Sequence, residues 1–356
     1  MPRDARVEAA VAHWGPRFVA NGVEPDDFRR ITASLERWDD WCRAWSRAAE
    51  EVERLAGAAE GAGRWRAAGQ LWFRASLYHH FGKFLFVHRR EEQRAAHERA
   101  VADFLRAAPW LDPPVERVEI PYEGRRLAAL LHRPAGLPRP PVVLLFPGLD
   151  SVKEELTAYA RELVARGMAA LAVDGPGQGE TEWEHPIEPR YERVAAALLE
   201  WVRERPDLDG GRVGVLGVSL GGFFAARAAA FTPGLRAAVV LGGGYDVASH
   251  WEGLSERTRL AYTVRQGAST LEEGRELARR ITLRDAAAEI GIPLLVIHGK
   301  RDRIIPWEEA VRLHEEARGP KELWLFEEGN HVCNNIPYRH RPQMADWLAE
   351  RLGARG

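Results

Sequence analysis

The chain has 356 residues, of which 46% are hydrophobic and 29% charged, a composition typical of soluble globular proteins with a sizeable apolar core. Its formal net charge of −2 provides no broad basic field, so we expect no nucleic-acid partner. The N-terminal segment MPRDARVEAAVAHWG lacks the apolar core of a signal peptide, and no run of about 18 apolar residues occurs. We therefore expect no membrane association and a cytoplasmic location.

The cysteine and histidine residues show none of the spacings that hold a metal ion. Cys42 and Cys333 are far apart in the sequence, which provides neither a disulfide framework nor a ligand pair. The histidines likewise lack ligand spacing. We expect two reduced thiols, no metal ion and no organic cofactor.

The first part of the chain carries almost no strand signal. Between Ser34 and Phe104 it is rich in Ala, Arg, Glu, Leu and Trp at helical spacing. We predict a helical domain over residues 1–112, with its first break at 57–64 (GAAEGAGR) and a Pro-rich boundary at 108–114. Two apolar sets are spaced as on one helical face: Phe28, Ile31, Leu35 and Trp38, and Leu71, Ala75, Tyr78 and Leu85.

From residue 113 to 356, short apolar segments alternate with helical ones, which predicts an α/β domain with a doubly wound, mostly parallel sheet. Residues 115–122 and 125–134 are expected to form a hairpin across Glu123-Gly124. The long interval 244–290 is predicted to be a helical insertion near the active site. The other expected strands are 142–146, 168–174, 212–218, 237–243, 293–299 and 322–328, and the expected helices are 154–166, 188–204, 221–231, 307–317 and 341–352.

The segment GVSLG (217–221) matches the pattern G-x-S-x-G between an apolar strand and a predicted helix. In that setting the serine occupies a sharp turn, and the small glycines let the strand and the helix approach each other. Ser219 is therefore the candidate nucleophile. A glycine-rich phosphate turn or a simple helix N-cap is the alternative interpretation of the same five residues.

A second loop, PGLDS (147–151), directly follows the first buried strand. In hydrolases with a G-x-S-x-G turn, such a loop donates one backbone N–H to the developing oxyanion, and the residue after the nucleophile donates another. The predicted oxyanion donors are the N–H groups of Leu149 and Leu220. Taken alone, the loop also fits an ordinary turn.

An acid and a base follow in the order that such hydrolases use. Asp302 comes just after one buried strand and His331 just after the next, so both can reach Ser219 at the carboxyl ends of the strands. His331 is the candidate general base, and Asp302 orients its imidazole. We expect His298, inside the strand before Asp302, to be a packing residue.

These motifs are similar to those of the α/β-hydrolase superfamily, and the chain resembles the capped carbon–carbon bond hydrolases and esterases typified by 2,6-dihydroxypseudooxynicotine hydrolase. The resemblance implies an α/β-hydrolase fold whose N-terminal helical domain acts as a cap, with 71–80 as a helix that faces the active site. The motifs that carry it are PGLDSVKEE (147–155), DGPGQGE (174–180), GVSLGG (217–222), the Asp302 loop and NHVCNN (330–335).

The resemblance also suggests where a substrate would be held. It implies polar or acidic groups in the cap and after the sixth strand, where Asp246 is an acidic candidate. The candidate substrate-binding residues are Tyr78, His79, His80, Asp150, His250, Trp251 and Glu252.

The predicted activity is a serine hydrolase that cleaves a small ketone or acyl substrate, with carbon–carbon bond hydrolysis preferred because of the resemblance. The triad serves ester hydrolysis equally well, so a broad-range carboxylesterase is the alternative. An acyltransferase and a binding protein with the same fold stay open, although a pure binder has no need of a complete triad. The expected partner is a small-molecule substrate, and the 13 tryptophans are compatible with a homodimer.

Overall fold

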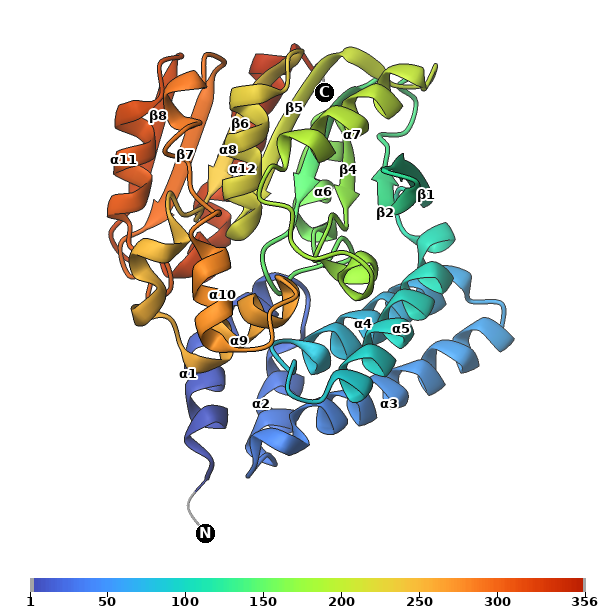
Figure 1. Cartoon of the computed structure of the whole chain (residues 1–356). Helices are drawn as coiled ribbons and strands as arrows, with labels where there is room; N and C mark the ends of the chain where they lie inside the picture. Colours follow the sequence, from blue (N-terminus) through green and yellow to red (C-terminus); the bar gives the residue numbers. More distant parts are fainter. Residues whose placement is uncertain (1–2, 355–356) are drawn as a thin grey trace. The chain divides into compact units, whose positions relative to one another are not determined.

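The computed structural model describes residues 3–354 (Figure 1). The chain divides into two compact units, and the division falls between Glu116 and Arg117. The first unit consists of helices, and nearly the whole of the sheet belongs to the second. Each unit is described by itself below.

The helical unit is built around three long helices that contact one another, α3, α4 and α5. Its first break comes earlier than the sequence predicts, because the chain leaves the helical conformation at 21–24 and again at 34–37. Gly22, with φ 112°, and Pro25 at the start of a helix explain the first interruption. The helices are α1 (Ala5–Ala20), α2 (Pro25–Ala33), η1 (Trp38–Asp40), α3 (Trp41–Gly61), α4 (Trp65–Lys83), α5 (Arg90–Ala107) and η2 (Ala108–Trp110).

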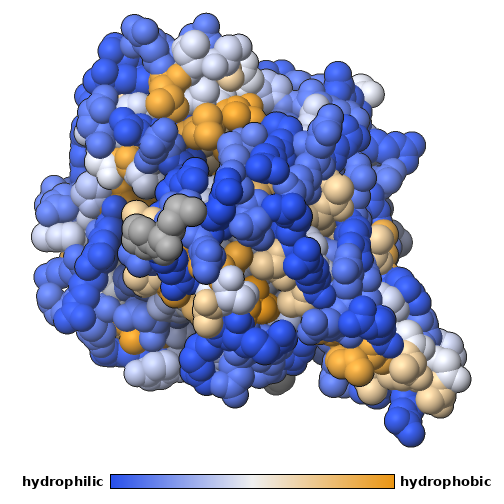
Figure 2. Space-filling view, turned by 90° about the horizontal axis from the view of Figure 1, so that it is seen from below, coloured by the Kyte–Doolittle hydropathy of each residue, from blue (hydrophilic) through white to orange (hydrophobic). Residues whose placement is uncertain are grey.

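Aromatic side chains fill the core of the helical unit. Trp41 and Trp45 are fully buried, and the rings of Phe18 and Phe81 stack with centroids 3.9 Å apart. Trp65 and Trp110 also stack, but both are partly exposed. On the face of the molecule in Figure 2, hydrophobic residues are scattered among hydrophilic ones. Much of the tryptophan content is thus used inside this unit.

The second unit is organised by an eight-stranded sheet within the described residues, in the order β1-β2-β4-β3-β5-β6-β7-β8. β2 pairs antiparallel with β4, and every pairing from β4 to β8 is parallel. β3, β4 and β7 are buried throughout, as expected for strands covered on both faces. The strands are β1 (Val115–Tyr122), β2 (Arg125–His132), β3 (Pro141–Phe146), β4 (Ala169–Val173), β5 (Asp209–Val218), β6 (Leu235–Leu241), β7 (Leu294–Gly299) and β8 (Lys321–Phe326).

The turn between β1 and β2 has the backbone that a two-residue hairpin needs. Glu123 and Gly124 both have positive φ, 48° and 77°. This geometry explains why a short Glu-Gly sequence is enough to join the two neighbouring strands.

Helices pack against the sheet in two groups. α7 and α8 contact each other and β5, whereas α6 and α12 contact each other, and α12 also contacts β5 and β6. Among residues 3–354, no helix is both long and apolar enough to cross a membrane. The remaining helices are α6 (Thr157–Val164), η3 (Gly179–Trp183), α7 (Glu192–Glu204), α8 (Leu220–Phe231), η4 (Val247–Gly253), α9 (Glu256–Arg265), α10 (Leu271–Ala278), η5 (Ala287–Glu289), α11 (Glu308–Glu316), η6 (His331–Cys333) and α12 (Pro337–Leu352).

Three predicted helix starts were wrong by three or four residues. α6 starts at Thr157 rather than 154, because residues 153–156 form turns, in which the N–H of Glu155 donates to Val152 and that of Thr157 to Glu154. α7 starts later than 188, since Pro189 disfavours a helical residue before it. α12 starts earlier than 341, with Pro337 in its first turn. The interval 244–290 is helical, as predicted.

Candidate active site

Four polar segments of the second unit follow parallel strands of the sheet. Residues 147–151 come after β3, Ser219 after β5, Asp302 after β7 and His331 after β8. Parallel strands present their carboxyl ends at one edge, where open α/β sheets bind their ligands. Segments up to 184 residues apart in the sequence are thereby brought to one place.

The turn at Ser219 is strained and sterically tight. Ser219 has φ 58° and ψ −120°, a conformation that a residue with a side chain rarely adopts. A Cβ added to Gly217 would lie 1.8 Å from the carbonyl oxygen of Gly221, and one added to Gly221 would lie 2.0 Å from that of Phe146. Only glycine fits at these two positions, so the G-x-S-x-G pattern is a requirement of this strand-to-helix turn.

The three predicted triad residues lie in one hydrogen-bonded series. His331 Nε2 is 2.9 Å from Ser219 Oγ, and His331 Nδ1 is 2.7 Å from Asp302 Oδ2. An ionised carboxylate only accepts hydrogen bonds, so Nδ1–H donates to Asp302 and Nε2 is left to accept from the Ser219 hydroxyl. This arrangement allows proton transfer from the serine to the imidazole.

Asp302 is held as an oriented, ionised carboxylate. Its Oδ1 accepts hydrogen bonds from the backbone N–H groups of Ile304 and Ile305, at 2.8 and 3.1 Å. Burial alone raises the pKa of Asp302, but the nearby His331 and His298 outweigh it and hold that pKa well below its usual range. The carboxylate is thus available to stabilise a protonated His331.

His298 is the packing residue that the sequence predicts, but it also contacts the acid. It is fully buried in β7, and its Nε2 lies 3.2 Å from Asp302 Oδ2 and 3.1 Å from the carbonyl oxygen of Ile305. The acid therefore has two imidazole neighbours, and only His331 reaches the serine.

The predicted oxyanion donors lie beside the nucleophile. A Cβ built on Gly148 would be 3.5 Å from Ser219 Oγ, so the loop that carries Leu149 adjoins the serine. Leu220 is the first residue of α8, and the N-terminus of a helix favours negative charge. Both residues are buried.

The substrate-binding candidates in the second unit differ in how far they are buried. Asp150 and Trp251 are buried, and His250 is half-buried next to Gly244. A role of these residues in substrate binding stays a prediction.

Two acidic candidates, Glu252 and Asp246, form ion pairs with arginine side chains. The Glu252 carboxylate is exposed and lies 3.3 Å from both Arg259 and Arg275. Asp246 caps η4 by accepting from the N–H of Ala248, and it pairs with Arg284 at 2.9 Å. Asp246 thus has a structural task at the start of its helix.

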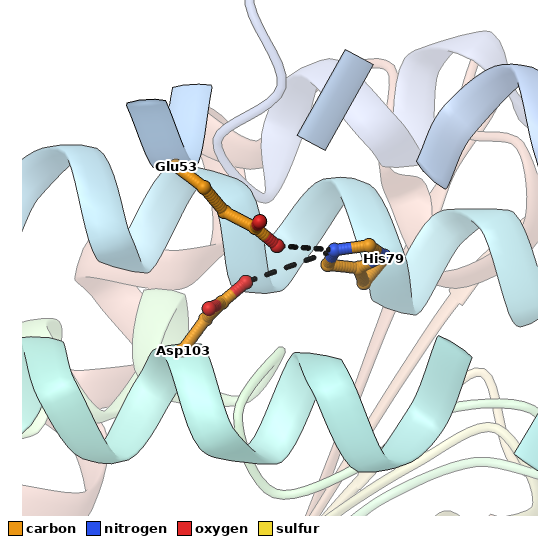
Figure 3. Close-up of side chains that lie close together, drawn as sticks. All are labelled: Glu53, His79 and Asp103. Carbon is orange, nitrogen blue, oxygen red and sulfur yellow. Dashed lines mark hydrogen bonds and ion pairs between the residues drawn. The ribbon is translucent and has the colours of Figure 1, made fainter. Parts of the chain in front are cut away.

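The three candidates in the helical unit are buried. The Tyr78 hydroxyl donates to Asp27, at 2.5 Å, and His80 is fully buried. His79 Nε2 is 2.7 Å from Glu53 and 3.8 Å from Asp103, so that side chains of α3, α4 and α5 meet (Figure 3).

Glu53, His79 and Asp103 are ligand types for a divalent cation, and one ligand atom from each lies within 4.8 Å of the others. A cation is already present, however. The Arg99 guanidinium bonds both oxygens of Glu53, at 2.9 and 2.8 Å. The cluster is therefore part of an ion-paired network that joins the three helices.

Comparisons with known proteins agree with this geometry. A family model described as Esterase FrsA-like matches residues 31–297. A protein of Paenarthrobacter nicotinovorans named 2,6-dihydropseudooxynicotine hydrolase is 31% identical over 98% of this chain and 94% of its own length. The crystal structure of the 2,6-dihydroxy-pseudo-oxynicotine hydrolase is 30% identical, with a TM-score of 0.87 and 97% of each chain covered.

Shorter similarities extend to fungal proteins. Alpha/beta hydrolase gkaG of Penicillium citrinum is 34% identical over 59% of this chain, which spans about half (53%) of that relative. The predicted α/β-hydrolase fold, the resemblance and the assignment as an enzyme are confirmed by these comparisons.

Proposed function

We propose that this chain, which belongs to the FrsA-like esterase family of α/β-hydrolases, cleaves a carbonyl substrate with Ser219 as nucleophile, His331 as general base and Asp302 as the orienting acid. The observation that carries the proposal is the hydrogen-bonded series from Asp302 through His331 to Ser219. A strained serine at the end of a strand, joined to such a pair, has the geometry of a nucleophile poised for acyl transfer.

The reaction then has two steps. Ser219 Oγ attacks the carbonyl carbon while its proton passes to His331, and the N–H groups of Leu149 and Leu220 bind the oxyanion. Collapse of the tetrahedral intermediate breaks the bond to the leaving group, which takes the proton from His331 and leaves an acyl-Ser219 ester. Water, deprotonated by His331, attacks this ester, and a carboxylic acid is released as Ser219 regains its proton.

We favour carbon–carbon bond hydrolysis of a small ketone. The similarity to the Paenarthrobacter hydrolase over nearly the whole chain supports this choice. In such a reaction the leaving group is a carbanion, which departs only when a β-carbonyl or an electron-rich ring stabilises it. Carboxylic ester hydrolysis is the second candidate, supported by the esterase description of the family. A cap role of the helical unit remains part of the proposal.

The test is a comparison of the purified protein with its Ser219→Ala variant. Both are assayed against p-nitrophenyl esters of graded chain length and against aryl β-diketones. We expect the variant to lose at least about a thousandfold in kcat on whichever set the protein cleaves. Faster turnover of the diketones supports the carbon–carbon hydrolase, and faster turnover of the esters supports the carboxylesterase.

A fluorophosphonate probe provides an independent measurement on the same two proteins. We expect one covalent adduct on Ser219, located by peptide mass spectrometry, and no adduct on the alanine variant. Equal activity of both proteins, or labelling of another serine, would reject Ser219 as the nucleophile.

A further inference from the structure

The loop that adjoins Ser219 is held from outside by side-chain donors. The Gln178 Nε2 amide donates to the carbonyl oxygen of Pro147 and, at 3.1 Å, to that of Gly148. The Arg265 guanidinium donates to the next carbonyl oxygen, that of Leu149. Three consecutive carbonyl groups are thus occupied by two buried side chains.

The occupied carbonyls determine where the N–H groups of the loop point. The peptide between Gly148 and Leu149 is trans, so its carbonyl and its N–H point in opposite directions. Because Gln178 holds the Gly148 carbonyl, the Leu149 N–H is directed away from Gln178. Arg265 orients the following peptide, which carries the N–H of Asp150, in the same way.

Gln178 is itself held in place. Its Oε1 accepts from the Tyr191 hydroxyl at 3.4 Å, and the Tyr191 ring stacks on Phe224 with centroids 3.9 Å apart. A Cβ on Gly175 would lie 2.0 Å from the Tyr191 hydroxyl oxygen, so glycine is needed there. This contact gives a physical reason for a glycine in the DGPGQGE segment (174–180).

The segment 174–180 also contacts Lys153, which follows the loop 147–151 in the chain. Asp174 accepts from the backbone N–H of Lys153 at 2.8 Å, and its other oxygen pairs with the Lys153 ammonium at 2.8 Å. A Cβ on Gly179 would lie 1.9 Å from the Asp174 carboxylate. Residues 174–180 therefore form a rigid support against which the loop is fixed.

Arg265 is supported by an ion pair that is almost entirely removed from water. It lies 3.0 Å from Glu182, and the two side chains are 1% and 0% exposed. Burying an ion pair carries a large desolvation cost, so this pair contributes little to stability by itself. Orientation of the Leu149 carbonyl explains why this buried ion pair is present, whereas its contribution to stability does not.

We propose that Gln178 is a positioning residue that sets the Leu149 N–H as an oxyanion donor, with the Arg265–Glu182 pair fixing the adjoining peptide. This inference rests on the proposed hydrolase function and deepens it. According to this proposal, the DGPGQGE segment (174–180) influences the rate of catalysis and does not contact the substrate.

The test compares Gln178→Met, which keeps the side-chain length and removes the amide, with Gln266→Met as matched control. Gln266 also donates to a backbone carbonyl, that of Gly274, at 3.1 Å, but among the described residues no hydrogen bond joins it to the loop. We expect Gln178→Met to lower kcat about 10- to 100-fold with KM changed less than threefold, since loss of a whole oxyanion donor costs about 100- to 1,000-fold. The control should stay within twofold of wild type.

Binding of a trifluoromethyl ketone separates positioning from a general structural effect. This inhibitor forms a tetrahedral oxyanion on Ser219, whereas the matching methyl ketone binds without one. We expect the trifluoromethyl ketone to weaken by the same factor as kcat/KM, and the methyl ketone to be unchanged. Arg265→Lys should show a smaller loss of the same kind, with Arg227→Lys, another buried ion-paired arginine, as its control.

The outcomes are distinguishable from a failure of the hydrolase proposal. A wild-type protein that cleaves no probe and is not labelled at Ser219 rejects both proposals. An active wild type whose Gln178→Met variant keeps its kcat, or loses affinity for both ketones equally, rejects only the positioning role. If Gln178→Met does not fold, as judged by circular dichroism, the same readouts are taken on Gln178→Leu, which also has no hydrogen-bond donor.

Discussion

Each unit of the molecule brings a histidine together with carboxylates, and the two sets differ in what surrounds them. In the sheet unit, Asp302 and His331 lie on loops after strands, and His331 continues to Ser219. In the helical unit, His79 meets Glu53 and Asp103 from the sides of regular helices (Figure 3).

The comparison shows that a histidine paired with a carboxylate is not by itself a candidate catalytic group. The Asp302–His331 pair ends at a serine with φ 58°, where strain and glycine packing fix one hydroxyl beside the imidazole. In the other set, Arg99 neutralises Glu53, and within residues 3–354 no hydrogen bond joins His79 to a hydroxyl. A catalytic role also requires a third group, the serine hydroxyl, and a backbone conformation that places it beside the imidazole. Ion-paired groups on helices instead join those helices to one another.

The largest expected effect is on activity and comes from Asp302→Asn. The change preserves the shape but replaces an acceptor with a group that can donate, which disfavours the required imidazole tautomer. We expect kcat to fall by at least about a thousandfold, with a melting temperature within a few degrees of wild type. A loss of less than tenfold in steady-state kinetics would show that Asp302 does not act through His331.

Glu53→Ala should have the opposite profile, with a loss of stability and little loss of kcat. It removes the carboxylate that His79 and Arg99 share, and hydrogen bonds to charged groups contribute about 1.5–3 kcal/mol. The matched control is Glu50→Ala, because Glu50 also pairs with Arg99 but is more exposed, and should lose less than about 1 kcal/mol. Urea unfolding measures both variants. Equal losses would contradict the distinction between the less and the more exposed partner of Arg99.

A pH dependence should also separate the two sets. Burial, followed by repulsion from Glu53, raises the pKa of Asp103 from 3.8 to about 8. The folded protein therefore favours the protonated carboxyl, and the free energy of unfolding falls as pH rises from about 4 through 8. Asp103→Asn removes this loss of stability. The melting temperature of the variant should therefore rise relative to that of wild type as the pH is raised from 5 to 9.

The control for this experiment is Asp112→Asn, which changes an exposed carboxylate of the same unit. Its melting temperature should run parallel to that of wild type over the same pH range. A parallel curve for Asp103→Asn would mean that Asp103 is ionised in the folded protein.

The smallest expected change concerns the thiols, one in each unit. Burial raises the pKa of both Cys42 and Cys333 to about 12, so neither should react with a disulfide reagent at pH 7 until the chain unfolds. Site-resolved labelling by mass spectrometry measures each thiol. Early labelling of Cys333, two residues after His331, would reveal local opening of the loop that carries the base.

The sequence predicted much of the sheet unit because its signals are local. Strands buried on both faces are continuous apolar runs, and the first glycine of G-x-S-x-G, Gly217, is required by its close approach to Gly221, a few positions along the chain. The helical unit was harder to predict. Leu35 and Trp38 have helical spacing and are buried, yet they lie beyond the end of α2, since an apolar residue in a connection packs as well as one in a helix.

The sequence by itself determined the α/β order of the second unit and pointed to Ser219, His331, Asp302 and the loop beside Ser219 as candidates, because each is marked by a short pattern next to a strand. Only the tertiary structure decided that His298 contacts Asp302 and that Gln178 and Arg265 hold the loop of Leu149. Gln178 and Arg265 lie 30 and 116 residues from the carbonyls they bind. Their contacts depend on strand register and helix placement, which no local pattern specifies.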